Sequence, residues 1–234
     1  MAHYVASANE FPVDVKVKHG ITKVQFANDN YNRILGVATW DGFVKILDVT
    51  NPNAPLDKRN QYHTKPVLAF TFMGGSDFIV SGDTDGNYQT RSIKCFPDGH
   101  AFVMSSIEGR VAVEYFDLNP EIQKNKYAFK CHRQKVDDSE FIYPVNAIAF
   151  HPQFNSFATG GSDGLVNVWD PSNRKRLCQL RKFNTSVVSL DFSSDGQFVA
   201  LATTYMYESD VPPVPVPDPE IMVRKITDFE VKPK

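Results

Sequence analysis

The stretch FATGGSDGLVNVWDP, at residues 157–171, decides the fold. Apolar and polar residues alternate on both sides of an Asp-Gly pair, and this period of two places one row of side chains on a buried face. Asp163-Gly164 supplies a residue that tolerates the positive φ of a tight hairpin. The stretch therefore predicts two antiparallel strands joined by a short turn.

The same pattern recurs along the chain, and this internal repetition is the organising feature. Each copy reads as a strand, a polar turn, a second strand, an acidic-Gly turn and a third strand. The copies cover residues 21–49, 66–86, 91–117, 144–170 and 185–208, and the last lacks the acidic-Gly turn. Short strands with a repeat of about 40–45 residues are typical of a WD-type β-propeller. The expected fold class is therefore all-β, a WD40 propeller.

The spacing of the turn glycines is irregular. Gly42, Gly86, Gly109 and Gly164 follow one another at intervals of 44, 23 and 55 residues. The longest interval indicates a blade plus an inserted loop at residues 127–141, whereas the shortest is too short for a four-stranded blade. We infer an internal deletion at about residues 86–88, which leaves four to five blades that need not close regularly.

We expect one propeller domain over residues 1–234. Its repeats are predicted at about residues 10–50, 62–86 (incomplete), 88–118, 142–171 and 183–229. Residues 220–229 are predicted to supply the last blade's missing strand, and residues 10–17 the strand that closes the ring. At the inferred deletion, the second repeat is expected to pair with residues 91–117 as one hybrid blade, with a chain reversal at residues 87–90.

Composition favours a soluble intracellular protein. The net charge of −2 gives no indication of nucleic-acid or membrane binding, which a strongly positive charge would give. The three cysteines, Cys95, Cys131 and Cys178, form no CxxC pair, and such a sparse odd set is typical of a reducing compartment. No stretch approaches the roughly 18 apolar residues of a membrane-spanning helix.

Catalytic chemistry has little support in the sequence. None of the six histidines pairs with a Ser or Cys in a nucleophile motif. Cys131 and His132 are adjacent, so on a strand they would face opposite sides and could not share a metal ion. Asp85, Asp163 and Asp170 are interpreted as turn and inter-strand hydrogen-bonding residues. We therefore expect a protein that is not an enzyme and has no metal or cofactor.

Longer strings resemble the mitotic-checkpoint Bub family of WD-repeat propellers. They are GRVAVEYFD (109–117), KYAFKCHR (126–133), YPVNAIAFH (143–151), FATGGSDGLVNVWDP (157–171), KRLCQL (175–180), YMYE (205–208) and KITDFEVKPK (225–234). The mRNA-export propellers of the Rae/Gle type are similar in EGRVA, FKCHR and AFHP, but GGSDGLVNVWDP and KPK favour the checkpoint family. That family has seven blades, which agrees with an internal deletion here.

The resemblance implies a non-enzymatic adaptor of the spindle assembly checkpoint. Such a protein binds GLEBS motifs of checkpoint kinases or pseudokinases and phosphorylated MELT repeats of a kinetochore scaffold. It is a monomer or a subunit of a hetero-complex in the nucleus, at the mitotic kinetochore and in the cytoplasm, with no membrane partner and with nucleic acid disfavoured. The alternatives are an mRNA-export propeller that docks on a nucleoporin, and a truncated isoform or gene-model product with reduced function.

The resemblance also assigns candidate site residues. The phosphopeptide-binding cations are Arg91, Arg110 and Lys130, and the partner-peptide residues are Trp40, Glu121 and Lys124. Arginine suits phosphate because its planar guanidinium donates several hydrogen bonds. The structural alternatives are that Arg110 caps a hairpin, that Lys130 is a solvated loop charge and that Trp40 stacks between blades. Because blades are missing, we expect weak or no binding of a GLEBS peptide.

Overall fold

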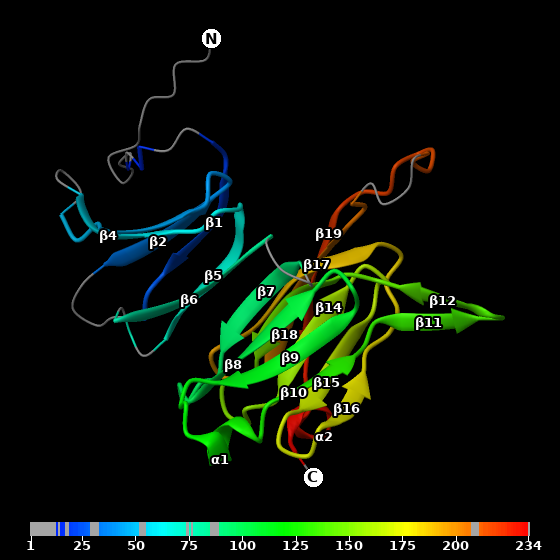
Figure 1. Cartoon of the computed structure of the whole chain (residues 1–234). Helices are drawn as coiled ribbons and strands as arrows, with labels where there is room; N and C mark the ends of the chain where they lie inside the picture. The colour runs from blue at the N-terminus through cyan, green and yellow to red at the C-terminus, as the bar shows by residue number, and fades with distance from the viewer. Residues whose placement is uncertain are drawn as a thin grey trace. The chain divides into compact units, whose positions relative to one another are not determined.

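The computed structural model describes residues 13, 15–16, 19–28, 33–51, 55–73, 75, 77–84, 89–206 and 211–233. Antiparallel strands dominate them, with two helices of four residues each, which confirms the all-β prediction (Figure 1). The chain forms two compact units, residues 1–85 and 86–234. The single propeller domain expected over the whole chain stays a prediction.

The first unit contains two sheets. One has the strands β1 (Ile21–Phe26), β2 (Ile34–Thr39), β3 (Phe43–Asp48) and β4 (Leu56–Tyr62) in chain order, and the other is the hairpin of β5 (Val67–Met73) and β6 (Phe78–Asp83). Apolar side chains of β2 and β3 pack against Val67, Phe70 and Phe72 of β5. The His63 ring bridges to β6, with Nδ1 2.8 Å from an Asp83 carboxylate oxygen and Nε2 2.8 Å from Ser81 Oγ.

The second unit contains three larger sheets and one hairpin. The first sheet has β7 (Thr90–Cys95), β8 (Ala101–Ser106), β9 (Arg110–Tyr115) and β10 (Tyr127–Lys130) in the order β10-β9-β8-β7, with helix α1 (Pro120–Gln123) between β9 and β10. The hairpin has β11 (Arg133–Val136) and β12 (Ser139–Ile142). The next sheet has β13 (Val145–Phe150), β14 (Phe157–Gly161), β15 (Val166–Asp170) and β16 (Lys175–Gln179). The last has β17 (Ser186–Phe192), β18 (Phe198–Thr204) and β19 (Glu220–Lys225), followed by helix α2 (Asp228–Val231).

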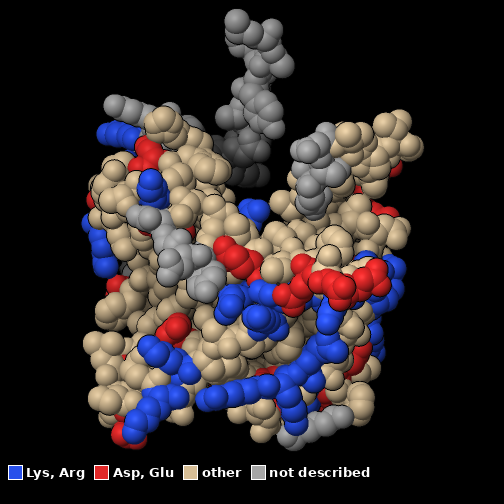
Figure 2. Space-filling view, turned by 45° about the vertical axis from the view of Figure 1, so that its right-hand side comes forward, with Lys and Arg blue, Asp and Glu red and all other residues tan. Residues whose placement is uncertain are grey.

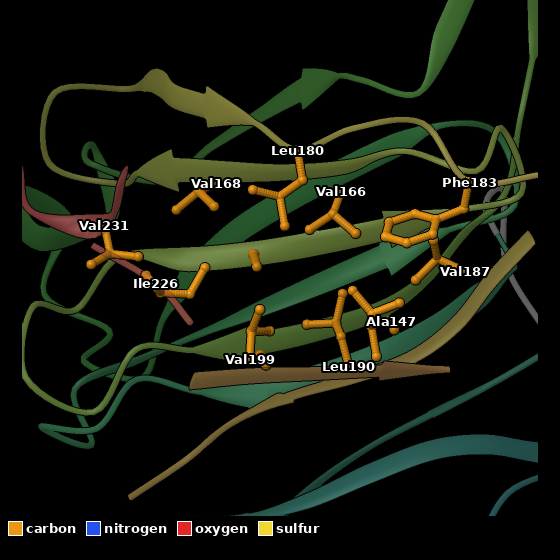
Figure 3. Close-up of a cluster of buried hydrophobic side chains, with 13 residues drawn as sticks. Ala147, Val166, Val168, Leu180, Phe183, Val187, Leu190, Val199, Ile226 and Val231 are labelled. Atoms are coloured by element: carbon orange, nitrogen blue, oxygen red, sulfur yellow. The ribbon is translucent and has the colours of Figure 1, made fainter. Parts of the chain in front are cut away.

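The core of the second unit lies between consecutive sheets. Figure 3 shows Val166 and Val168 of β15 facing Val187, Leu190 and Val199 of the last sheet. The alternation of the sequence produces this layer, since each of these residues is on the buried side of its strand. A second cluster joins the inward valines of β8 and β9 to β13 and β14. Sequential sheets therefore stack on one another as propeller blades do.

The acidic-Gly turns have the predicted geometry. Gly109 has φ +60° and Gly164 has φ +75°, which L side chains rarely adopt. A Cβ atom on Gly164 would also lie 2.4 Å from the carbonyl oxygen of Phe183, so the neighbouring backbone leaves no room for another residue.

The structure confirms one strand assignment and corrects two. The strand predicted at residues 220–229 is confirmed for residues 220–225, which form β19 and pair with β18, whereas Asp228 and Phe229 begin helix α2. The hybrid blade is wrong for the described residues, because β5 and β6 pair only with each other while β7 pairs with β8. Residues 127–141 are not simply a loop, since they hold β10, the outer strand of its sheet, and most of the β11–β12 hairpin.

Two predicted features fall partly or wholly on residues that the structure does not describe. The turn at residues 87–90 lies mostly outside the described residues, and so does Asp85. Of the proposed closing strand at residues 10–17, only Val13, Val15 and Lys16 are described, and none of the three is in a strand. Val13 and Val15 pack against Val37, Leu47 and Val49 of the first unit. The closure of the ring by this segment stays a prediction.

Candidate functional site

The three predicted phosphate-binding cations lie at one end of the β7–β10 sheet. Arg110 begins β9 and Lys130 ends β10, and the two residues are directly opposite each other in the antiparallel ladder. Directly opposite residues share a face, with Cβ atoms about 4.5–5.5 Å apart. Arg91 lies where the register of β7 against β8 shifts, between Thr90 and Ser92. Thr90 pairs with Ser106, the last residue of β8, which the chain leaves just before the turn into Arg110. Strand pairing therefore gathers cations that are up to 39 residues apart in the sequence.

A pocket of about 290 Å³ adjoins Arg110. It is lined by Met104, Ser105, Ser106, Arg110, Val111, Ala112, Glu114 and Ala128. Ala112 is opposite both Met104 and Ala128, so these three small or flexible apolar side chains share the face that carries Arg110. An apolar surface with a cation at one end is suited to a peptide that carries a phosphate beside an apolar side chain.

Arg91 differs from the other two cations in its environment. Its side chain is half-buried, and its Nε atom is buried without a hydrogen-bond partner among the described residues. An unsatisfied guanidinium N–H is costly, and an anion that accepts a hydrogen bond from it would remove this cost. A phosphate could reach this buried atom only if the side chain moved, so the place of Arg91 in the phosphate-binding set stays a prediction.

Lys130 lines a different pocket, of about 230 Å³, whose polar wall includes Arg133 and Arg176. Arg133 is fixed in place: its guanidinium donates to Glu140 Oε2 at 2.8 Å and to the carbonyl of Glu108 at 2.8 Å. Arg176 donates to Asn167 Oδ1 at 3.3 Å. Sequence reasoning missed both arginines, although they lie in the AFKCHR and KRLCQL strings that carried the resemblance.

A buried hydrogen-bond network supports the loop between Lys130 and Arg133. His132 Nδ1 lies 2.8 Å from Asp163 Oδ1, and its Nε2 lies 2.8 Å from Thr159 Oγ1, which also accepts from Trp169 Nε1 at 2.9 Å. Asp163 further accepts the N–H of Leu165 in its own turn. The structural role predicted for Asp163 is confirmed. The adjacent Cys131 thiol is buried, and this burial raises its pKa to about 12.

Asp170 is also structural, as predicted. Its carboxylate accepts the backbone N–H groups of Ser172 and Asn173 and the side-chain amide of Asn173. These bonds hold the turn between β15 and β16.

The predicted partner-peptide residues are divided between the two units. Trp40 is in the β2–β3 turn of the first unit and is 53% exposed. Its ring lies close to Gly20, since a Cβ atom added to Gly20 would be 3.2 Å from Trp40 Cδ1. Glu121 and Lys124 are in the second unit, where they form an exposed ion pair at 2.6 Å. Glu121 lies in helix α1 and Lys124 at its C-terminal end.

The surface charge, the metal-ligand residues and the helix lengths complete the description of the site's surroundings. Lys and Arg side chains gather on the face shown in Figure 2, with Asp and Glu among them. Within the described ranges, no group of three or more His, Cys, Asp or Glu side chains is placed to hold a metal ion. The helices described here are all too short to cross a membrane. The candidate site is thus Arg110 beside an apolar pocket, with Lys130 opposite it in the ladder.

Comparison with known proteins supports the resemblance. The family model "WD domain, G-beta repeat" matches residues 124–170. The chain is 56% identical over 215 residues to "Mitotic checkpoint protein bub-3" of Caenorhabditis elegans, which covers 83% of this chain and 63% of that protein. It is 51% identical over 201 residues to "Mitotic checkpoint protein BUB3.1" of Arabidopsis thaliana, covering 86% of this chain and 52% of that protein.

A second group of relatives matches less of the chain. "Protein RAE1" of Arabidopsis thaliana is 42% identical over 118 residues, covering 50% of this chain and 32% of that protein. The chain spans 52% to 65% of the length of the first three checkpoint relatives, which agrees with a propeller shortened relative to its family. The sequence-based resemblance to the mitotic-checkpoint Bub family and the WD-repeat fold class are thus both confirmed.

Proposed function

We propose that this chain is a non-enzymatic binding scaffold of the spindle assembly checkpoint and that it binds a phosphothreonine peptide at Arg110 and Lys130. The main supporting observation is the cross-strand pairing of Lys130 with Arg110, which lines an apolar pocket. The names of its checkpoint relatives support the checkpoint role. On this proposal the chain acts in the nucleus, at the mitotic kinetochore and in the cytoplasm.

The proposed ligand is a phosphorylated MELT repeat of a kinetochore scaffold. Its phosphate would accept hydrogen bonds from Arg110, Lys130 and Arg91, and its neighbouring apolar side chains would contact Met104 and Ala112. Each charge-assisted hydrogen bond is worth about 1.5–3 kcal/mol. Because Arg110 starts directly after a tight turn at Gly109, its backbone is fixed before the peptide binds.

The test is calorimetric titration with a Met-Glu-Leu-phosphothreonine peptide and its unphosphorylated form. Arg110→Ala should weaken binding of the phosphorylated peptide about tenfold or more, since it removes at least one charge-assisted bond. Lys130→Ala should act in the same direction. Lys135→Ala removes an exposed lysine of β11 and is the matched control, which should bind as the parent does. Equal losses for both peptides in Arg110→Ala would mean that this residue acts through the fold.

A second proposed partner is a GLEBS peptide of a checkpoint kinase or pseudokinase. The residues assigned to it are Trp40 in the first unit and Glu121 and Lys124 in the second. A peptide of this kind would contact several blades, and the chain spans little more than half of some relatives. We therefore predict weak or undetectable binding by calorimetry. Sub-micromolar binding that Trp40→Ala abolishes would contradict this prediction and show that the retained blades suffice.

The alternative function, docking on a nucleoporin in mRNA export, has weaker support. The export-factor relatives cover at most 63% of the chain, whereas the checkpoint relatives cover at least 83%. The net charge of −2 also disfavours a broad RNA-binding surface.

A further inference from the structure

A pocket of about 280 Å³ lies between two consecutive sheets of the second unit, where the outer strand β10 passes beside β15 and β16 (Figure 1). Its floor is aromatic, because the ring centroids of Phe129 and Trp169 are 4.7 Å apart and Tyr127 stacks on Phe129 at 6.1 Å. All three rings are half-buried and pack against the core cluster between these sheets. The core therefore fixes the walls of this β10–β15 pocket.

Tyr127 also ties the two sheets together. Its hydroxyl donates to the carbonyl oxygen of Pro171, in the turn between β15 and β16, at 3.0 Å. Arg174 reaches back from the same turn: its guanidinium lies 4.7 Å from the centroid of the Tyr127 ring and donates to the carbonyl of Asn125 at 3.3 Å. The pocket is thus formed before any ligand arrives, which lowers the cost of binding.

The rim of the pocket carries positive charge. Arg174 and Lys175 line it, and Arg176 lies directly opposite Trp169 in the β15–β16 ladder. Among the residues that the structure describes, no Asp or Glu forms an ion pair with these three cations. Asp170 also lines the pocket, but it is 1% exposed and its carboxylate accepts hydrogen bonds from its own turn. The rim is therefore suited to an anionic group from outside the chain.

The backbone at Arg174 does not itself favour arginine. Its φ of +52° lies in the left-handed region, which glycine and asparagine adopt most readily. The turn alone therefore does not account for a long cation at this position, whereas the contacts of its side chain beside the pocket do.

We propose that the β10–β15 pocket binds an acidic linear peptide, which inserts one apolar side chain against Phe129 and Trp169 and places an adjacent Asp or Glu carboxylate at Arg174 and Lys175. The volume is just below the range of about 300–1,000 Å³ that is usual for small-molecule pockets, so it suits a single large side chain. A guanidinium and an ammonium group at the rim both donate charge-assisted hydrogen bonds to a carboxylate.

Single-stranded nucleic acid is the competing occupant, because bases stack on aromatic rings beside cations. The rings of Phe129 and Trp169 are tilted by 56° and half-buried, so they form the walls of a cleft and not a flat stacking surface. The net charge of −2 also disfavours contact with many phosphates. These features favour the peptide. Neither Arg110 nor Lys130 lines this pocket, so the inference does not rest on the proposed function.

Fluorescence titration of the full chain tests the proposal. In the Trp40→Phe background, Trp169 is the only tryptophan and reports directly on the pocket. The synthetic peptide Asp-Glu-Phe-Glu-Asp should change its emission saturably. Two control peptides should not: Asp-Glu-Ala-Glu-Asp lacks the apolar side chain, and Lys-Arg-Phe-Arg-Lys reverses the charge. Added salt should weaken binding, since the carboxylates contact cations at an open rim.

Variants in the same background locate the binding. Arg174→Gly keeps the φ of the turn and removes the cation, so it should raise the dissociation constant about tenfold, as expected for the loss of a charge-assisted hydrogen bond. Lys175→Ala should act in the same direction. Lys182→Ala removes an exposed lysine that does not line the pocket and is the matched control. Arg110→Ala should also bind this peptide as the parent does, which separates this test from that of the proposed function.

Three results would overturn the proposal. The first is no saturable change in Trp169 emission up to about 1 mM peptide, the weak end of specific binding. The second is an equal dissociation constant for the parent, Arg174→Gly and Lys175→Ala. The third is saturable binding of a short oligothymidylate with none of the acidic peptide, which would assign the pocket to nucleic acid.

Discussion

At the scale of single residues, His151 shows how burial fixes a protonation state. Its ring is buried and stacks on Phe154 with centroids 4.8 Å apart. Nε2 lies 3.0 Å from the carbonyl oxygen of Gly196, and Nδ1 accepts the N–H of Gln153 at 3.3 Å. Burial lowers the pKa of His151 despite the opposing effects of Gly196 and Asp228. A second ring proton would face the Gln153 N–H, so the neutral ring fits the site.

This environment predicts that stability falls as pH falls. The unfolded His151 binds a proton below about pH 6.5, whereas the folded residue does so only at lower pH, so the unfolded state takes up more protons in that window. The stability is complete above about pH 6.5 and decreases below it. Urea unfolding at pH 7.5 and at pH 5.5 measures the change. His151→Phe should flatten the dependence and His19→Phe, at an exposed position, should keep it; an unaltered slope in His151→Phe would contradict the assignment.

At the scale of the elements, the close approach of β14 to β17 depends on a glycine. A Cβ atom on Gly160 would lie 2.5 Å from Cγ1 of Val187 and 2.9 Å from Cδ2 of Leu190. Both side chains belong to the core cluster shown in Figure 3. The branched Val187 side chain has few rotamers, so the two strands would have to separate. This contact joins two successive sheets.

We predict that Gly160→Ala lowers the free energy of unfolding of the second unit by about 1–3 kcal/mol, the usual cost of overpacking. Denaturant unfolding measures this loss. Ser189→Ala changes an exposed residue on the same strand β17 and should alter stability by less than about 0.5 kcal/mol. An unchanged unfolding midpoint in Gly160→Ala would show that the sheets can move apart without cost.

At the scale of the whole molecule, the chain forms two units with separate buried clusters. Those of the first unit involve β2, β3 and β5, and those of the second involve the sheets from β7 onward. The chain has two tryptophans, Trp40 in the first unit and Trp169 in the second. Each unit therefore carries one intrinsic fluorescent probe.

We predict that the two units unfold in separate transitions, because chains with distinct compact units commonly depart from two-state behaviour. Trp40→Phe leaves Trp169 to report on the second unit, and Trp169→Phe leaves Trp40 to report on the first. The two variants should give different urea midpoints by fluorescence, and far-UV circular dichroism of the parent should show both transitions. Coincident curves from both probes would mean that the chain unfolds as one cooperative body.

Local sequence signals predicted individual strands and turns well. They failed for very short strands and for the choice of which strands pack together. The need of the last blade for a further strand predicted β19 within residues 220–229, and the acidic-Gly pairs predicted the turns at Gly109 and Gly164. The strands β10 to β12 have four residues each, which is too short for their alternation to stand out. The hybrid blade failed because Phe70 and Phe72 of β5 already bury themselves against β2 and β3.

The sequence by itself determined the all-β class, the repeats, the glycine turns and the identity of the candidate cations. These features depend on side-chain period and backbone φ, which are local properties of the chain. Only the tertiary structure decided that Lys130 lies opposite Arg110 and that α1 occupies the connection between their strands. Strand register and sheet neighbours depend on packing between segments far apart in sequence, and local periodicity carries no information about that packing.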